Sequence, residues 1–290
     1  MKTFLISLLI LISIVVGVGW FVNTNINTEF VENAIDHVIE PKADSWQFAV
    51  IGDVEGMRDV SRAMIEDMKT RDIEFLINVG DVGSKPDAAE MQGVVDAFAT
   101  LPFETYYVPG NNDLIYNETL EIKTDELYRE IVSETTYQSF DFKDAHLILL
   151  DNSYRRYGFT DEELTWLESD FAKNTQKHTF LFFHRPLNVP GEQLFGDDET
   201  TFSREQNDTF KILISQYTID RIFNGHLHTN LSYRLDATPV TITGGGGALP
   251  QEMLGGADAA FFHYVIVTVY EDETPPVLDI VEFNDEQPTL

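Results

Sequence analysis

Short apolar runs that end in carboxylate, amide or imidazole side chains are the feature that most constrains this chain. The run 46–51 leads into Gly52-Asp53, and the run 75–79 leads into Gly80-Asp81. Their length and flanking residues are typical of buried β-strands. Further strands are predicted at 105–108, 139–142, 147–150, 179–183, 221–223, 229–235, 239–243, 261–270 and 276–282, and helices at 57–70, 86–99, 125–133, 160–174 and 205–217. Strands that alternate with helices and then follow one another directly predict an α/β core that carries a second, more antiparallel sheet.

The composition indicates a chain with a folded core and excludes several kinds of site and partner. Of the 290 residues, 43% are hydrophobic and 12% aromatic, which excludes wholesale disorder. The absence of cysteine excludes a disulfide scaffold, a thiol nucleophile and a thiolate metal site. A formal net charge of −30 repels polyanions, so we expect no nucleic-acid partner and disfavour a nuclease.

The beginning of the chain is predicted to be a targeting element. Residues 3–22 carry no charged side chain and follow the single Lys2, and this run has the length of a helix that crosses a bilayer. A cleaved signal peptide is the alternative, with Gly17 and Gly19 as the fair cleavage candidates. Because Lys2 favours the cytoplasmic side, we expect an extracytoplasmic body, either anchored in the membrane or secreted after cleavage.

The sequence divides into four parts. The anchor or signal peptide at 1–22 is followed by a polar tether at 23–45. A single domain is expected over 46–283, and residues 284–290 form a short tail.

Potential metal ligands recur at the ends of successive predicted strands. They are Asp53, Glu55, Asp81, Asn111, His184, His226 and His228. Carboxylates mixed with imidazoles, without thiolates, suit Mn, Fe or Zn. One carboxylate can bridge two ions, and a two-metal site lowers the pKa of a shared water and clamps a phosphoryl oxygen. A single Gly-Asp pair is common in turns, but an ordered series at strand ends indicates a site.

The series resembles the calcineurin-like metallophosphoesterase superfamily, whose blocks run D-x-H, G-D, G-N-H-D/E, H and G-H-x-H. In this chain the blocks read Asp53-Val54-Glu55, Gly80-Asp81, Gly110-Asn111-Asn112-Asp113, His184 and Gly225-His226-Leu227-His228. The intervening Leu150-Asp151-Asn152 and Phe182-Phe183-His184-Arg185-Pro186 are similar in style to the purple-acid-phosphatase-like branch. The resemblance covers about residues 46–270 and implies a two-sheet β-sandwich flanked by helices.

The resemblance also implies roles at the site. Two divalent or trivalent ions would be bridged by Asp81, and the family's bridging hydroxide would attack phosphorus in line. Asp53 and His228 would hold the first metal. The second metal would be held by Asn111, His184 and His226.

The chain departs from the family pattern at three positions. Glu55 replaces the first-block histidine, so it either ligates the first metal through a carboxylate or points to solvent. Asn112 stands where the family has its general-acid histidine, and an amide cannot transfer a proton at neutral pH. Ser84 replaces the tyrosine of purple acid phosphatases, which argues against a coloured ferric site.

Several residues outside the blocks are also interpreted. Arg185 either clamps a substrate phosphate or pairs with the acidic surface. The glycines at 244–247 follow a strand and indicate close backbone packing near the site. His146, His178 and His263 flank or lie within apolar runs and are interpreted as ordinary core or strand-edge residues.

The function predicted from these observations is metal-dependent hydrolysis of a phosphoric ester, either a monoester or a diester. The substrate would be a small-molecule phosphoester. The alternative is a metal-binding but catalytically silent envelope protein on the same fold, suggested by Glu55 and Asn112 together. The substrate, the native metal pair and the oligomeric state stay open.

Overall fold

The computed structural model describes residues 44–117, 122–154, 156–190, 201–252 and 256–284. The expected anchor or signal peptide at 1–22, nearly all of the tether at 23–45 and nearly all of the tail lie outside these residues. Among the helices within the described ranges, none is both long enough and apolar enough to cross a membrane.

Five strands form the first sheet, in the order β13-β12-β1-β2-β3. Their bounds are Ser45–Ile51 for β1, Phe75–Asn78 for β2, Glu104–Tyr107 for β3, Phe262–Tyr270 for β12 and Val277–Phe283 for β13. β1, β2 and β3 run parallel, whereas β12 is antiparallel to β1 and β13 is antiparallel to β12. This sheet is therefore mixed.

Six strands form the second sheet, in the order β10-β11-β9-β8-β7-β6. Their bounds are Gln138–Phe142 for β6, Ala145–Leu149 for β7, His178–Phe182 for β8, Arg221–Asn224 for β9, Asn230–Leu235 for β10 and Thr238–Thr243 for β11. The four central strands run parallel, and the edge strands β6 and β10 are antiparallel to their neighbours. The consecutive strands of the last third thus do not make a sheet of their own: β10 and β11 complete this sheet, and β12 and β13 complete the first.

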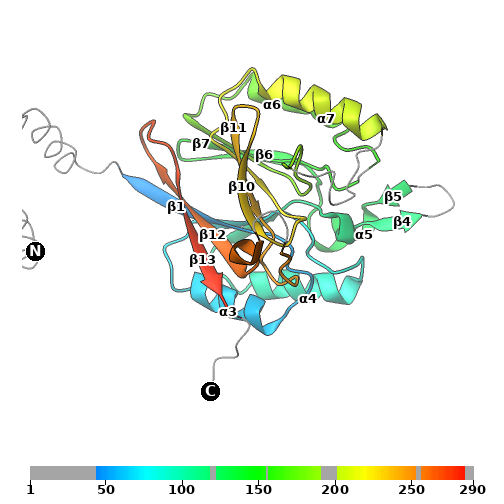
Figure 1. Cartoon of the computed structure of the whole chain (residues 1–290), viewed down its shortest axis with the longest axis vertical. Helices are drawn as coiled ribbons and strands as arrows, with labels where there is room; N and C mark the ends of the chain where they lie inside the picture. The colour runs from blue at the N-terminus through cyan, green and yellow to red at the C-terminus, as the bar shows by residue number, and fades with distance from the viewer. Residues whose placement is uncertain (1–43, 118–121, 155, 191–200, 253–255, 285–290) are drawn as a thin grey trace, which may run out of the picture. The chain divides into compact units, whose positions relative to one another are not determined.

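Helices cover the outer face of each sheet, as Figure 1 shows. Their bounds are Asp59–Met68 for α3, Ala88–Phe98 for α4, Glu126–Ile131 for α5, Asp161–Phe171 for α6 and Thr201–Ile214 for α7. α3, α4 and α5 share a core with the first sheet, and α6 and α7 share another with the second. Side-chain oxygens of Asp87 and Thr160 accept backbone N–H groups in the first turns of α4 and α6 and so define where these helices begin.

The two sheets pack against each other through a third core rich in aromatic rings. Phe48 of β1 stacks on Phe75 of β2 with ring centroids 5.2 Å apart, and Phe182 stacks on Phe223 at 5.4 Å. Neighbouring residues of β1 alternate between this core and the helical core, because successive side chains of a strand point to opposite faces. Strands buried on both faces explain the continuous apolar runs in the sequence.

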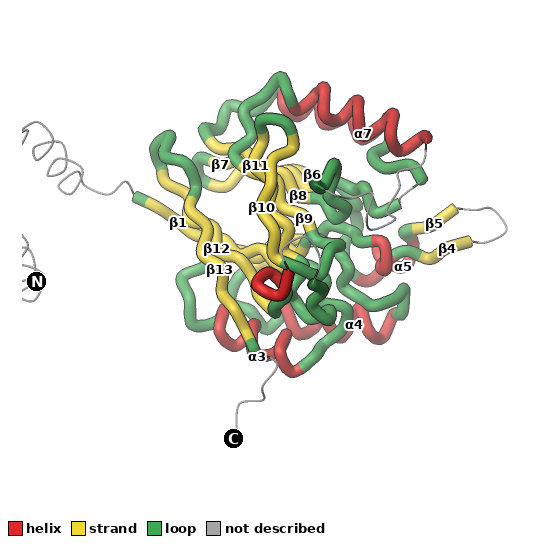
Figure 2. Tube along the Cα trace, viewed as in Figure 1, coloured by secondary structure: helices red, strands yellow, loops and turns green. Residues whose placement is uncertain are grey.

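The predicted helices and strands all occur, within a few residues of their expected bounds. Within the described ranges, the hairpin of β4 (Ile115–Asn117) and β5 (Ile122–Thr124), which pairs with neither large sheet, was not predicted, nor were the short 3-10 helices at Asn111–Asp113 and Gly256–Ala259. Figure 2 shows the hairpin projecting beside α5. Its strands are three residues long and β4 is exposed, so no apolar pattern marks it.

Candidate active site

The carboxyl ends of parallel strands bring the centre of the predicted site together. Asp53 follows β1, Asp81 follows β2 and His184 follows β8. Each offers one ligand atom, and these atoms all lie within 4.8 Å of one another. All three side chains are buried. Ligand sites of α/β folds commonly form at this end of the strands.

The backbone is strained where the polar residues gather. Asp53, Glu55, Asp81 and His226 have positive φ angles of 57°, 47°, 54° and 71°. Residues other than glycine rarely adopt this left-handed conformation, and it persists only where the surrounding structure imposes it. Such residues cluster at functional sites, and here four of them carry side chains predicted to ligate metal.

Two glycines of the motif blocks let neighbouring loops approach the carboxylates. A Cβ atom on Gly110 would lie 2.1 Å from Oδ1 of Asp81, and one on Gly225 would lie 2.5 Å from Oδ2 of Asp53. No side chain fits at either position without displacing a carboxylate.

Asp81 lies in the middle of the cluster and is held through both oxygens. The backbone N–H of Asn112 donates to its Oδ1 at 2.8 Å, and the Asn112 side-chain amide donates to its Oδ2 at 2.9 Å. The same Oδ2 lies 3.4 Å from Nε2 of His184.

A first group of residues surrounds Asp53. The backbone N–H of His226 donates to both carboxylate oxygens of Asp53, at 3.0 and 2.9 Å. Nε2 of His228 lies 3.5 Å from Oδ1 of Asp53 and 3.4 Å from Oε1 of Glu55. The Asn112 amide donates to the same oxygen of Glu55 at 3.3 Å. The Glu55 carboxylate thus lies against His228 and Asn112, and its role as a metal ligand stays a prediction.

A second group surrounds His184. Nδ1 of His184 lies 2.9 Å from the carbonyl oxygen of Val79, so this nitrogen carries a proton and Nε2 is the one turned to the site. Nε2 lies 3.1 Å from Oδ1 of Asn111, and the rings of His184 and His226 have centroids 5.1 Å apart. Arg185 donates through Nη1 to the same Asn111 oxygen at 3.4 Å.

The electrostatics of the cluster follow from burial and mutual charge. Burial raises the pKa of Asp53 to about 7, and the charge of Asp81 adds to this effect. Burial alone would lower the pKa of His184, but the charge and hydrogen bond of Asp81 outweigh it and raise this pKa to about 9. For Asp81, burial is outweighed by His184, and its pKa is lowered. Protonated imidazoles thus balance the buried carboxylates, and a metal cation can take over that role with release of protons.

The side-chain atoms of the site are of the kinds that bind the predicted metal ions. Buried carboxylate oxygens, an amide oxygen and imidazole nitrogens are ligands that Mn, Fe and Zn accept. The hydrogen bond from His184 to Val79 leaves the ligating nitrogen directed at Asp81 and Asn111, as in metal-binding histidines generally.

Supporting contacts around the site were only partly predictable. The N–H groups of Gly246 and Ala248 donate to the carbonyls of Gly52 and Asp53, which confirms the predicted close packing of the glycine-rich segment. Asp113 lies in a motif block but is not among the predicted metal ligands. It is fully buried and accepts the N–H groups of Gly83 and Gly110, so it ties the Asp81 loop to the Asn111 loop.

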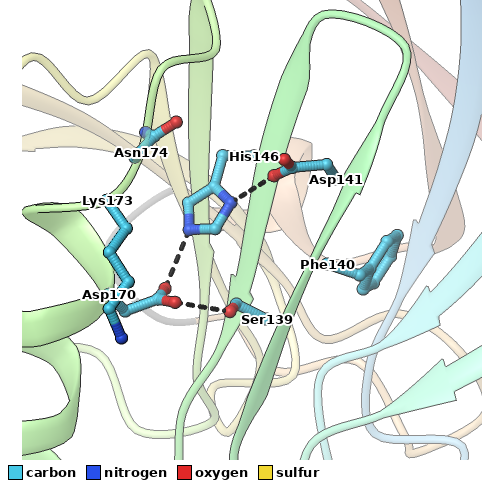
Figure 3. Close-up of a pocket in the computed structure, with 7 residues that line it drawn as sticks. All are labelled: Ser139, Phe140, Asp141, His146, Asp170, Lys173 and Asn174. Carbon is cyan, nitrogen blue, oxygen red and sulfur yellow. Dashed lines mark hydrogen bonds and ion pairs between the residues drawn. The ribbon is translucent and has the colours of Figure 1, made fainter.

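Among the described residues, the three histidines outside the blocks have structural environments, as predicted. His146, His178 and His263 are all buried. Figure 3 shows His146 between Asp141 and Asp170, with ring nitrogens 2.6 and 2.8 Å from their oxygens. A cavity of about 310 Å³ borders this cluster, at the start of β7 and therefore away from the carboxyl ends of the strands.

Comparison with known proteins agrees with this geometry. The sequence profile of the calcineurin-like phosphoesterases matches residues 47–230. The chain belongs to the calcineurin-like phosphoesterase family. This match includes every residue predicted to hold a metal, from Asp53 to His228. No curated protein sequence matches the chain.

Solved structures share the fold of this chain at low sequence identity. Purple acid phosphatase from yellow lupin has a TM-score of 0.65 at 15% identity, and the match covers 85% of this chain and 53% of that one. GAP50, described as the anchor in the inner membrane complex of Plasmodium, has a TM-score of 0.57 at 12% identity, with coverage of 83% and 85%. A dimetal phosphatase from Danio rerio has a TM-score of 0.55 at 10% identity, with coverage of 80% and 98%. This chain thus spans about half the length of the lupin protein.

Proposed function

We propose that this phosphoesterase hydrolyses a phosphoric ester, a monoester or a diester, at a site that holds two divalent or trivalent ions of Mn, Fe or Zn. The observation that carries the proposal is the buried cluster of Asp53, Asp81 and His184. Asp81 would contact both ions. The first would be held by Asp53, Glu55 and His228, and the second by Asn111, His184 and His226. When bound, the ions would acidify a water molecule so that it serves as the nucleophile, and would neutralise phosphoryl charge.

Two side chains of the site have roles besides metal binding. Arg185 lies against Asn111 and presents a planar set of donors suited to phosphate oxygens. Asn112 donates to Asp81 and Glu55, so it orients these carboxylates at the reacting end of the site. Since its amide cannot supply a proton, the site favours substrates whose leaving group is stable as an anion.

We further propose that the enzyme works outside the cytoplasm, held at the membrane by residues 1–22 or secreted after their removal. The charge-free run at 3–22 supports this proposal. The net charge of −30 supports a small-molecule phosphoester rather than a nucleic acid as substrate.

Hydrolysis of two aryl esters tests the proposal. The purified chain, stripped and reloaded with Mn²⁺, Fe²⁺ or Zn²⁺, is assayed with p-nitrophenyl phosphate and bis(p-nitrophenyl) phosphate. Turnover that needs metal and disappears in Asp81→Ala supports the enzyme, and the preferred ester identifies the substrate class.

A catalytically silent metal-binding protein is the second candidate. Glu55 and Asn112 together favour it, because both replace histidines of the family pattern. Bound metal without turnover in the wild type, and turnover gained by Glu55→His with Asn112→His, would decide for this candidate.

A further inference from the structure

Asn152 lies where β7 has ended and joins the main chain that follows β8. Its side-chain Nδ2 donates to the carbonyl of Arg185 at 2.7 Å, and the N–H of Arg185 donates to its Oδ1 at 2.9 Å. Asn152 is 2% exposed. Both polar ends of a buried amide are therefore committed to the backbone of one residue.

The segment that carries Asn152 is itself fixed. The N–H of Ser153 donates to Oδ1 of Asp151 at 3.0 Å, which closes a turn around Asn152. The N–H of Asp151 donates to the buried carboxylate of Glu163 on α6 at 2.7 Å. The amide of Asn152 is thus presented from a rigid platform between a strand and a helix.

The residue that this amide holds stands at the edge of the candidate active site. Arg185 directly follows His184, is half-buried and donates through Nη1 to Oδ1 of Asn111. A guanidinium binds phosphate best when its planar fork is preorganised, because its long side chain otherwise loses rotamer freedom on binding. The backbone position of Arg185 therefore sets how well its guanidinium meets a phosphate oxygen.

We propose that Asn152 is a positioning residue for substrate phosphate, which it serves by fixing the main chain of Arg185. The proposal rests on the proposed function of the same site. Asn152 does not touch the substrate in this account, so its effect passes entirely through Arg185.

Inorganic phosphate, the product of monoester hydrolysis and a phosphoryl mimic, is the probe. Its Kd for the metal-loaded full chain is measured by calorimetry, alongside KM and kcat for p-nitrophenyl phosphate and the metal content. We expect Asn152→Ala to weaken phosphate binding and raise KM by about tenfold, as loss of buried hydrogen bonds to a preorganised group would. Metal content and kcat should change little.

The decisive comparison is the double variant. In the Arg185→Ala background, Asn152→Ala should have no further effect on the Kd of phosphate. Asn152→Ser keeps a neutral polar group that can replace at most one of the two hydrogen bonds, so it should give an intermediate effect and serves if Asn152→Ala does not fold.

Asn174 offers a matched control at the other end of β8. Its side chain also makes two hydrogen bonds, donating to Thr179 at 2.9 Å and accepting from the N–H of Gln176 at 2.8 Å. Asn174→Ala should lower stability and leave the Kd of phosphate unchanged.

Two results would overturn the proposal while the proposed function stands. One is a wild type that hydrolyses the ester, with Arg185→Ala impaired and Asn152→Ala unimpaired. The other is an equal loss of phosphate affinity from Asn152→Ala in the wild type and in the Arg185→Ala background. A metal-loaded wild type that neither hydrolyses the ester nor binds phosphate would overturn the function and this inference together.

Discussion

Asn112 holds both carboxylate oxygens of Asp81, one through its backbone N–H at 2.8 Å and the other through its side-chain amide at 2.9 Å. The residue at the position of the family's general acid thus serves as a support for the central carboxylate. This relationship separates two properties that a histidine would combine, the orientation of Asp81 and the supply of a proton.

Replacing Asn112 by histidine should therefore change which esters are hydrolysed. We expect Asn112→His to accelerate esters with poor leaving groups by about 100-fold or more relative to aryl esters, the lower range for a positioned acid. The measurement is the dependence of kcat/KM on the pKa of the leaving alcohol, which should be steep in the wild type and shallower in the variant. Asn112→Ala, as control, should slow all esters alike. An unchanged slope in Asn112→His would show that proton supply does not limit the reaction.

Glu55 should contribute to metal affinity at the first group. Its carboxylate lies 3.4 Å from Nε2 of His228 and faces the site, so Glu55→Gln removes a charged oxygen donor there. We expect one of two Mn²⁺ ions to bind at least tenfold more weakly, as measured by calorimetry, since even outer partners of metal ligands have effects of about 10–100-fold. Glu66→Gln makes the same charge change on an exposed side chain paired with Lys69 and should leave binding intact. Equal affinities in both variants would remove Glu55 from the metal site.

A methyl group at Gly110 should damage the site. The added Cβ would lie 2.1 Å from Asp81 Oδ1, so Gly110→Ala must displace the central carboxylate or its loop. We expect lower thermal stability and loss of metal binding. Gly93→Ala is the matched control: nothing lies within 4 Å of its added Cβ, and in the interior of α4 it should stabilise the fold. The gain should be about 0.5–1 kcal/mol in the free energy of unfolding. A Gly110→Ala protein that binds metal normally would contradict the close approach seen here.

His178 should make stability depend on pH. Burial alone would lower its pKa, but hydrogen bonds to Asp220 and to the carbonyls of Asp272 and Tyr270 outweigh burial and raise it above the ordinary 6.5. A raised folded-state pKa stabilises the fold fully below the unfolded value, and this contribution is lost as the pH rises through the folded value. The wild type should therefore have a higher free energy of unfolding than His178→Gln, and this difference should shrink as the pH increases above 6.5. Urea unfolding measures both free energies.

His263 provides the opposite case. Burial lowers its pKa to about 4, so the contribution of His263 to the free energy of unfolding should rise between pH 4 and 6.5 and stay constant above pH 6.5.

The His178 prediction would be contradicted by a difference in free energy of unfolding between the wild type and His178→Gln that is constant across pH 6 to 9. The ion pair of His178 would then carry no pH dependence.

Much of the fold was predictable because its strands are buried on both faces. The run 46–51 and its successors carry continuous apolar signals, and the polar residues that follow them mark the strand ends. The distribution of the last strands between two sheets was not predictable, because β12 pairs with β1, which lies at the other end of the domain in sequence. The β4–β5 hairpin has too few apolar residues to leave a pattern.

The site was predictable in its ligand types but not in its supports. Asp53, Asp81 and His184 follow strands and belong to motif blocks, so sequence alone placed them together. The carbonyl of Val79 orients His184 through a backbone atom, which no side-chain pattern reveals. Asn152 acts on the backbone of a residue that is distant in sequence, and only the parallel pairing of β7 with β8 brings the two together.

The most direct test of the central claim is a titration of the metal-free protein with Mn²⁺ in which bound metal and p-nitrophenyl phosphate hydrolysis are followed together. Activity should rise to a plateau at about two ions per chain, and Asp81→Ala, which loses the carboxylate proposed to hold both ions, should show neither the plateau nor the activity. A folded wild type that binds Mn²⁺ to saturation without hydrolysing the ester, or an Asp81→Ala variant that remains active, would contradict that claim.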